Sequence, residues 1–114
     1  MINEFVKLTY KESSDAGWWD GLGDNPVVVP LKLSLIHSEI SEALEADRKN
    51  LMDDKLTHRQ GIEVELADAI IRIADLAGFL GLDLDGAIKE KMEFNRHRED
   101  HQKEARNKEN GKKY

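Results

Sequence analysis

The sequence predicts an all-α fold in which four helices form a bundle. No stretch of useful length alternates apolar and polar residues as a strand would, whereas apolar residues recur at the spacing of helices. The chain of 114 residues has the length of a single domain. A chain of this size can bury enough surface to fold without disulfides or structural metals.

The first two helices are predicted on either side of a loop rich in glycine and aspartate. The apolar pattern places the first helix over residues 3–13, and the loop that follows reads DAGWWDGLGDNPVV. Pro30 suits the first turn of a helix, where a backbone N–H group would have no partner in any case. The second helix is therefore predicted over residues 30–50.

The third and fourth helices are predicted from the residues that end or cap them. Thr57 and Gln60 resemble a capping box, in which two side chains satisfy backbone N–H groups at a helix start. The third helix should end near Leu80, because Gly81 can adopt the left-handed conformation that follows many helices. Asp83 can then cap the start of the fourth helix.

The fourth helix is expected to run to about Asp100, so residues 1–100 are predicted to form the helical domain. The remaining segment, residues 101–114, reads HQKEARNKENGKKY and is polar. Segments of this composition at a chain end are commonly mobile when nothing binds them. We therefore expect residues 101–114 to form a flexible tail.

Composition limits the partners and the compartment. The net charge of −6 argues against a protein that coats nucleic acid, although divalent cations could still admit a nucleotide. The most apolar stretch, residues 69–82, is interrupted by Arg72 and Asp75, which argues against a membrane span. The chain has no cysteine, and its first residues lack the apolar core of a signal peptide. A cytoplasmic location is expected.

The third predicted helix carries a line of charge that its other residues do not explain. Its apolar residues cover most of the circumference, so the helix should be central and packed on several sides. The charged line consists of Glu65, Asp68, Arg72 and Asp75, at spacings of three, four and three. Carboxylates shielded from water need a counter-charge. Arg72 can neutralise one neighbour, Asp68 or Asp75, but not the whole line.

The second predicted helix supplies matching acids. Glu39 and Glu42 lie together on one flank of its apolar stripe. If the second and third helices pack antiparallel, these acids can face Glu65 and Asp68 across a gap. An oxygen-only site of this kind suits Mg²⁺ first and Mn²⁺ second. A di-iron site would need Glu-x-x-His motifs, which are absent here. The alternative is that these acids are ordinary solvated helix faces.

This ordered set of motifs resembles the MazG-like members of the all-α nucleoside triphosphate pyrophosphohydrolase superfamily. Their signature is ExxE, a spacer and ExxD, which here are residues 39–42, 22 intervening residues and residues 65–68. The segment IKEKMEFNRHR resembles the K-x-x-x-N-x-x-R element of that family, at residues 91–98. The resemblance covers residues 31–98. Arg72 departs from it, because relatives often carry an apolar or aromatic residue there. Two roles are open for Arg72: a structural pair with Asp75, or contact with substrate phosphate.

The resemblance implies a function and a set of site residues. The implied reaction is hydrolysis of a nucleoside triphosphate, often a deoxy or non-standard one, between its α and β phosphates, which releases a monophosphate and pyrophosphate. It also implies homodimers or homotetramers in which helices of neighbouring subunits build the site. The implied Mg²⁺ ligands are Glu39, Glu42, Glu65 and Asp68.

The remaining roles are hypotheses about substrate contacts. Glu39 or Glu42 could accept the proton of the attacking water. Lys91 and Arg98 would clamp phosphate oxygens, and Asn95 could donate a hydrogen bond to phosphate or sugar. Trp19 could stack on the nucleobase. The alternative for these residues is structural, with an ordinary basic face on the fourth helix and a tryptophan that closes the end of the bundle.

Two non-enzymatic functions compete with this prediction. One is a helical interaction module whose acids dock a basic protein partner. The other is a member of the same family that binds nucleotides as a sensor and does not hydrolyse them. The charge line on the third helix argues against the first, because a central helix would not present its acids for docking.

Overall fold

The computed structural model describes residues 1–98 and 102–114 and is all-α, as predicted. Within these residues there is no strand, only an isolated antiparallel bridge between Met52 and Gln60. None of the described helices is long and apolar enough to cross a membrane. In chain order the helices are α1 (Ile2–Asp15), α2 (Val28–Lys49), α3 (Gly61–Leu80), α4 (Leu84–His97) and α5 (Lys103–Arg106).

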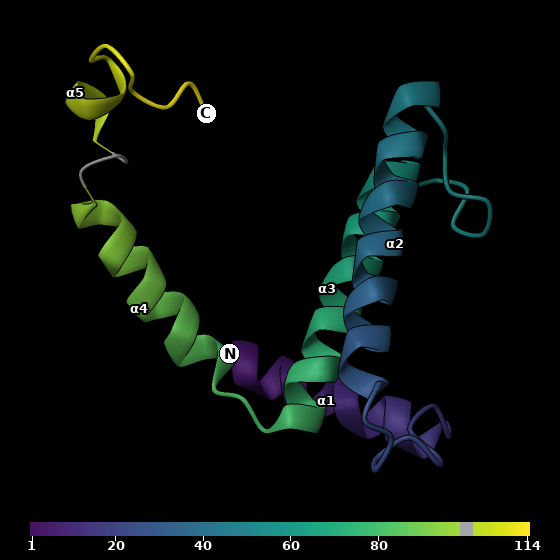
Figure 1. Ribbon diagram of the computed structural model, residues 1–114. Coiled ribbons are helices and arrows are strands. Elements are labelled where there is room, and N and C mark those ends of the chain that lie inside the picture. The colour runs from purple at the N-terminus through teal and green to yellow at the C-terminus, as the bar shows by residue number, and fades with distance from the viewer. Residues whose placement is uncertain (99–101) are drawn as a thin grey trace.

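The long helices α2 and α3 lie side by side and antiparallel (Figure 1). The first helix, α1, crosses α3 near the C-terminal end of α3. The core is small, and its two clusters of buried residues in the described part of the chain both include residues of α3. One cluster contains Val6, Ala74 and Ala77, and Gly78 follows directly on α3. A Cβ atom on Gly78 would collide with the Tyr10 side chain, so glycine permits this close approach of the two helices.

Several predicted helix ends are confirmed. Gly81 follows α3 with a φ of 67°, in the left-handed region where glycine has no steric penalty. The Asp83 side chain accepts a hydrogen bond of 3.0 Å from the Gly86 N–H group and caps α4. Pro30 lies in the first turn of α2. These ends follow from local backbone chemistry, which explains why the sequence predicts them.

The predicted capping box at the start of α3 is wrong. Gln60 is itself the N-cap residue, in extended conformation, and no side chain caps the helix. The preceding loop instead closes through backbone contacts: Gln60 pairs with Met52, and the Gly61 N–H group donates to the Leu51 carbonyl at 2.8 Å. Thr57 therefore lies in the loop, one turn too early to cap α3.

The fourth helix does not pack along the other helices in this chain. It is attached at its start, where the Asn3 amide donates to Asp83 at 2.8 Å and accepts from the Asp85 N–H group at 3.0 Å. From there α4 extends away from α2 and α3 (Figure 1). It ends at His97, and the predicted end near Asp100 lies outside the described residues, as does the predicted domain boundary. The tail contains the short helix α5, which the sequence analysis did not predict.

The α2–α3 pair exposes a large amount of apolar surface. The third helix was predicted to be covered on several sides; among the described residues its main neighbours are α2, α1 and the loop that carries Trp19. Large apolar side chains on both helices remain between 40% and 60% exposed. They include Leu31, Leu33, Ile40, Leu44, Leu66, Ile70, Ile71, Ile73 and Leu80. The two longest helices therefore leave much of their apolar surface uncovered within the single chain.

Candidate metal centre

Three of the four predicted metal ligands converge between α2 and α3. Glu39 and Glu42 come from α2, one helical turn apart, and Glu65 comes from α3. One carboxylate oxygen of each lies within 4.8 Å of the others. The ExxE spacing places both α2 acids on one face, and antiparallel packing brings α3 opposite them. An all-oxygen set of this size suits a hard divalent cation.

Glu39 is the most buried of the acids, at 7% exposure, and it is paired with an arginine. The Arg72 Nε–H group donates to Glu39 Oε1 at 2.7 Å. Burial by itself would raise the pKa of Glu39, but the hydrogen bond from Arg72 outweighs it, with help from Glu65, and the pKa is lowered. Arg72 thus pairs with the more deeply buried acid across the interface, and not with Asp68 or Asp75, the partners considered for it on its own helix.

Glu65 has the one carboxylate oxygen of the cluster, Oε2, that is buried without a hydrogen-bond partner among the described residues. Burial, followed by the neighbouring Glu39 and Glu42, raises the pKa of Glu65 to about 8. Glu65 therefore holds a proton at neutral pH in the absence of a cation. A buried, unpaired carboxylate oxygen among acids fits a bound divalent cation, which would replace this proton.

Asp68, the fourth predicted ligand, lies at the edge of the cluster. It is not one of the three acids whose oxygens converge. Burial and the charge of Glu39 raise the pKa of Asp68, which indicates that the two carboxylates are close enough to interact. Both residues also line the same cleft. Asp68 can therefore hold a cation only at the side of the cluster that faces this cleft.

The cleft next to the cluster has a volume of about 460 Å³ and is walled by α1, α2, α3 and the loop after α1. This volume lies within the range of small-molecule sites. Three residues give it a mixed chemistry: Trp18 offers an exposed aromatic face, at 70% exposure, and Lys32 and Arg72 are cationic. The other lining residues are Thr9, Glu12, Ser13, Ala16, Glu39, Asp68, Ile71 and Asp75.

Trp19, predicted to contact the substrate, is a core residue instead. It is 8% exposed. One face stacks on Phe79, with ring centroids 4.2 Å apart, and Lys32 Nζ lies 4.5 Å from the ring centroid. The indole N–H group donates to Asp75 Oδ1 at 2.9 Å. With its ring and its N–H group engaged, Trp19 has no free face for a nucleobase. The structure thus favours the structural alternative for Trp19.

The basic element on α4 lies apart from the acid cluster. Of the three predicted substrate contacts, Lys91 and Asn95 lie on α4, which extends away from α2 and α3 (Figure 1), and Arg98 is the residue that follows this helix. Lys91 Nζ lies 4.7 Å from the centroid of the Phe94 ring, and the Arg98 guanidinium carbon lies 5.8 Å from it. Within one chain, these residues cannot act on a ligand held by the cluster.

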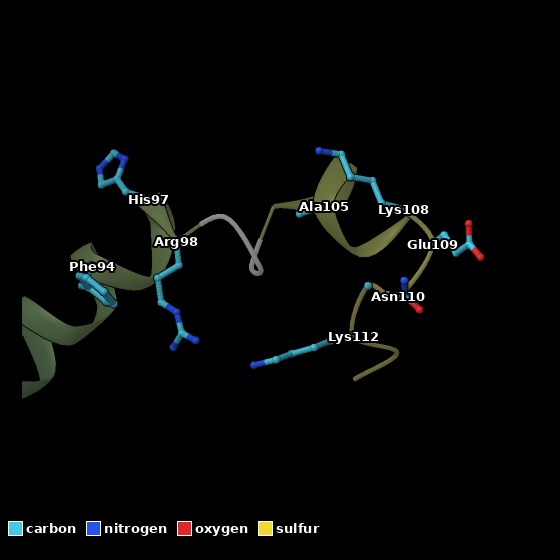
Figure 2. A pocket seen from close by; sticks show the side chains of 9 residues that line it. Phe94, His97, Arg98, Ala105, Lys108, Glu109, Asn110 and Lys112 are labelled. Carbon is cyan, nitrogen blue, oxygen red and sulfur yellow. The ribbon is translucent and has the colours of Figure 1, made fainter.

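A second cavity of about 670 Å³ lies between the end of α4 and the tail. Figure 2 shows the Arg98 and Lys112 side chains extending from opposite sides into this space, with Phe94 at its edge. Lys108 also lines it, and these three cationic residues outnumber the one acid among the described lining residues, Glu109. The α4 end is thus a basic surface, and the α2–α3 interface is an acidic one.

The chain matches no family model, no curated protein and no solved structure.

Two features of the site were missed in the sequence analysis. Trp18 and not Trp19 faces the cleft, and Lys32 from α2 lines it beside Arg72. A loop has no periodicity from which to tell which of two adjacent tryptophans points inward. Lys32, however, lies seven residues before Glu39 and so on the same helix face, a signal the sequence did contain.

Proposed function

We propose that the protein is a Mg²⁺-dependent nucleoside triphosphate pyrophosphohydrolase that releases a nucleoside monophosphate and pyrophosphate. One observation carries the proposal: oxygens of Glu39, Glu42 and Glu65 lie within 4.8 Å of one another, with Glu65 Oε2 buried and unpaired. The motif resemblance at residues 39–42, 65–68 and 91–98 supports the same reaction.

The acids would have two roles, which are holding the cation and accepting a proton. Glu39, Glu42 and Glu65 would hold Mg²⁺, or Mn²⁺ in its place, with Asp68 on the side of the cleft. When bound, the cation supplies positive charge for the phosphate oxygens and lowers the pKa of a bound water. Glu42 is the exposed member of the three, whereas Glu39 is paired with Arg72. Glu42 is therefore the acid best placed to accept a proton from the attacking water.

The neighbouring cleft supports binding of the nucleoside half of the substrate. Trp18 presents an exposed aromatic face on which a nucleobase can stack, a role that Trp19 cannot fill. Lys32 and Arg72 supply positive charge beside Glu39 and Asp68, where phosphates would meet the cation. A deoxy or non-standard nucleotide is the proposed substrate, on the strength of the motif resemblance alone.

The proposal includes a homodimer or homotetramer in which α4 of one subunit serves the acid cluster of another. Lys91, Asn95 and Arg98 lie apart from the cluster of their own chain, so they could contact its substrate only from a second copy. The exposed apolar residues of α2 and α3 supply a surface through which copies could associate. The four-helix bundle predicted from the sequence would then be completed between subunits. The proposed location of the assembly is the cytoplasm.

Pyrophosphate release from a panel of standard, deoxy and oxidised nucleoside triphosphates tests the proposal. The panel is assayed with Mg²⁺ and with EDTA, and the nucleotide product is identified. Mg²⁺-dependent release of pyrophosphate with a monophosphate as the second product is expected for at least one substrate. Release of orthophosphate would contradict the cleavage position. A folded protein that binds Mg²⁺ and nucleotide but releases nothing would instead be a nucleotide sensor.

A further inference from the structure

Arg72 lies where the acid cluster meets the cleft. Its Nε–H group donates to Glu39 Oε1 at 2.7 Å, yet 39% of its side chain is exposed, against 9% for Glu39. Arg72 also lines the cleft together with Trp18 and Lys32. The guanidinium can thus reach either the buried acid or a ligand in the cleft without any movement of α3.

The pairing of Arg72 with Glu39 supplies a positive counter-charge within the acid cluster. A buried carboxylate without a counter-charge is costly, and Glu39 is the most buried acid in the cluster. The acid one turn further along α3 is already occupied, because Asp75 accepts hydrogen bonds from Ser13 and Trp19. Arg72 is therefore the positive group that the chain itself provides to Glu39.

A divalent cation would take over this role. A cation held by Glu39, Glu42 and Glu65 would neutralise the same carboxylate that Arg72 now neutralises. It would also lie close to a guanidinium of the same sign, which weakens the pair between Arg72 and Glu39. A guanidinium released in this way has several N–H donors in a fork that matches phosphate oxygens. The cleft where a phosphate would lie is already in its reach.

We propose that Arg72 is a substrate-positioning residue with two alternative partners: Glu39 before the cation binds, and a triphosphate oxygen in the cleft afterwards. This inference rests on the proposed function, because it requires a cation in the cluster and a triphosphate in the cleft. It adds a residue that the family motifs do not contain. It also makes cation binding a precondition for full phosphate binding, since the guanidinium is otherwise held by Glu39.

The first experiment follows the Arg72 Nε–H group directly by ¹H–¹⁵N NMR of the wild-type protein. The signal is assigned by its loss in Arg72→Lys. Mg²⁺ is expected to shift this signal, and a non-hydrolysable α,β-methylene triphosphate is expected to shift it again, whereas NaCl of equal ionic strength leaves it in place. A signal that stays unchanged while other resonances of the cluster respond to Mg²⁺ would overturn the exchange of partners.

The second experiment measures Mn²⁺ affinity by electron paramagnetic resonance in wild type, Arg72→Met and Arg96→Met. Arg96 pairs with Glu93 on the surface of α4, so its variant makes the same charge change away from the cluster. In Arg72→Met, Mn²⁺ no longer competes with a guanidinium for Glu39, so its affinity is expected to rise about tenfold. The Mn²⁺ affinity of Arg96→Met should equal that of the wild type. At saturating Mn²⁺, the triphosphate analogue should bind about tenfold more weakly to Arg72→Met.

The outcomes separate this inference from the proposed function. Mn²⁺ binding that is equal in wild type and Arg72→Met, or an unchanged affinity for the analogue, overturns the role of Arg72 and leaves the metal centre intact. Absence of Mn²⁺ binding to the wild type overturns the proposed function, and the role of Arg72 with it. If Arg72→Met does not fold, Arg72→Lys keeps the charge but loses the fork, and its analogue affinity should still be weakened.

Discussion

Trp19 and Phe79 stack with their ring centroids 4.2 Å apart and their planes inclined by only 6°. This pair joins the loop after α1 to the end of α3, and Tyr10 of α1 packs edge-on against both rings. The same loop carries Trp18 to the mouth of the cleft, where it remains 70% exposed. Two adjacent tryptophans therefore have opposite roles, one in the core and one at the candidate substrate site.

Substitution of the two tryptophans should separate stability from substrate binding. Trp19→Ala removes a buried aromatic ring and is expected to cost about 3–5 kcal/mol of unfolding free energy, measured by urea denaturation. Trp18→Ala should leave unfolding almost unchanged and raise KM for the nucleotide severalfold, because its exposed face is available for stacking. An unaltered KM in Trp18→Ala would remove Trp18 from the substrate site.

The close approach of α1 and α3 at Gly78 gives a test of the fold itself. A Cβ atom there would meet the Tyr10 side chain and lie 3.3 Å from the Val6 carbonyl oxygen. Alanine is intrinsically better than glycine in a helix by about 1 kcal/mol, so local propensity alone predicts stabilisation. We expect the clash to prevail and Gly78→Ala to lose about 1–3 kcal/mol in urea denaturation. Gly23→Ala, where a Cβ meets nothing within 4 Å, is the control and should be near neutral.

The features that the sequence predicts correctly follow from local backbone chemistry or from helical periodicity in two neighbouring helices. The conformation of Gly81 and the cap provided by Asp83 follow from local backbone chemistry. The convergence of Glu39, Glu42 and Glu65 needs only helical periodicity and antiparallel packing of neighbouring helices.

Features that depend on the burial of one particular side chain, or on contacts between distant parts of the sequence, could not be predicted in this way. Spacing favours a partner for Arg72 on its own helix, and only the burial of Glu39 redirects it across the interface. The direction of α4 depends on the contacts of Asn3 with Asp83 and Asp85, which are some 80 residues away in the sequence. Helical periodicity in the sequence predicts neither the partner of Arg72 nor the direction of α4.

Two glutamates one turn apart on α2 provide a matched test of the metal centre. Glu42→Gln is expected to abolish Mg²⁺-dependent pyrophosphate release while the far-ultraviolet circular dichroism remains helical, because an amide is a poor ligand and cannot accept the proton. Glu45→Gln loses surface ion pairs with Arg48 and Lys49 and should retain activity. Full activity in Glu42→Gln would exclude Glu42 from both roles.

The raised pKa of Glu65 predicts how stability depends on pH without a divalent cation. The pKa is about 8 in the folded protein and 4.5 for an ordinary glutamate, so between these values the folded state holds a proton that the unfolded state has released. Unfolding then releases a proton, and stability must fall as pH rises through this window. The pKa of Asp68 is also raised, so its titration likewise lowers stability as pH rises. The pKa of Glu39 is lowered, so its titration raises stability as pH rises, in a lower pH range.

Urea denaturation in EDTA at about pH 6 and about pH 9 measures this effect. The midpoint should be lower at the higher pH, and Mg²⁺ should restore it there, because the cation replaces the proton among the acids. Glu65→Gln keeps a neutral side chain at every pH and should flatten the dependence. A wild-type midpoint that rises with pH in this range would contradict the protonated state of Glu65.

The last prediction concerns which chain supplies the basic residues of α4. Glu42 lies in the acid cluster and Arg98 at the far end of α4, so one protomer does not bring them together. Glu42→Gln and Arg98→Ala should each be inactive alone. If sites form between copies, a dimer with one chain of each variant has one site with both substitutions and one intact site. An equal mixture that exchanges subunits should therefore recover about a quarter of wild-type activity.

Recovery of activity requires both subunit exchange and a site shared between chains, and these can be separated. Ile70→Glu places a charge on the exposed apolar face of α3, where Ile70 is 57% exposed, and should shift the protein toward monomers in size-exclusion chromatography with light scattering. Introduced into both variants, it should prevent recovery. If subunits exchange and no activity returns, Arg98 does not act on the cluster of a second copy. A shared site would have given every mixed dimer one intact site, and that site would have been active.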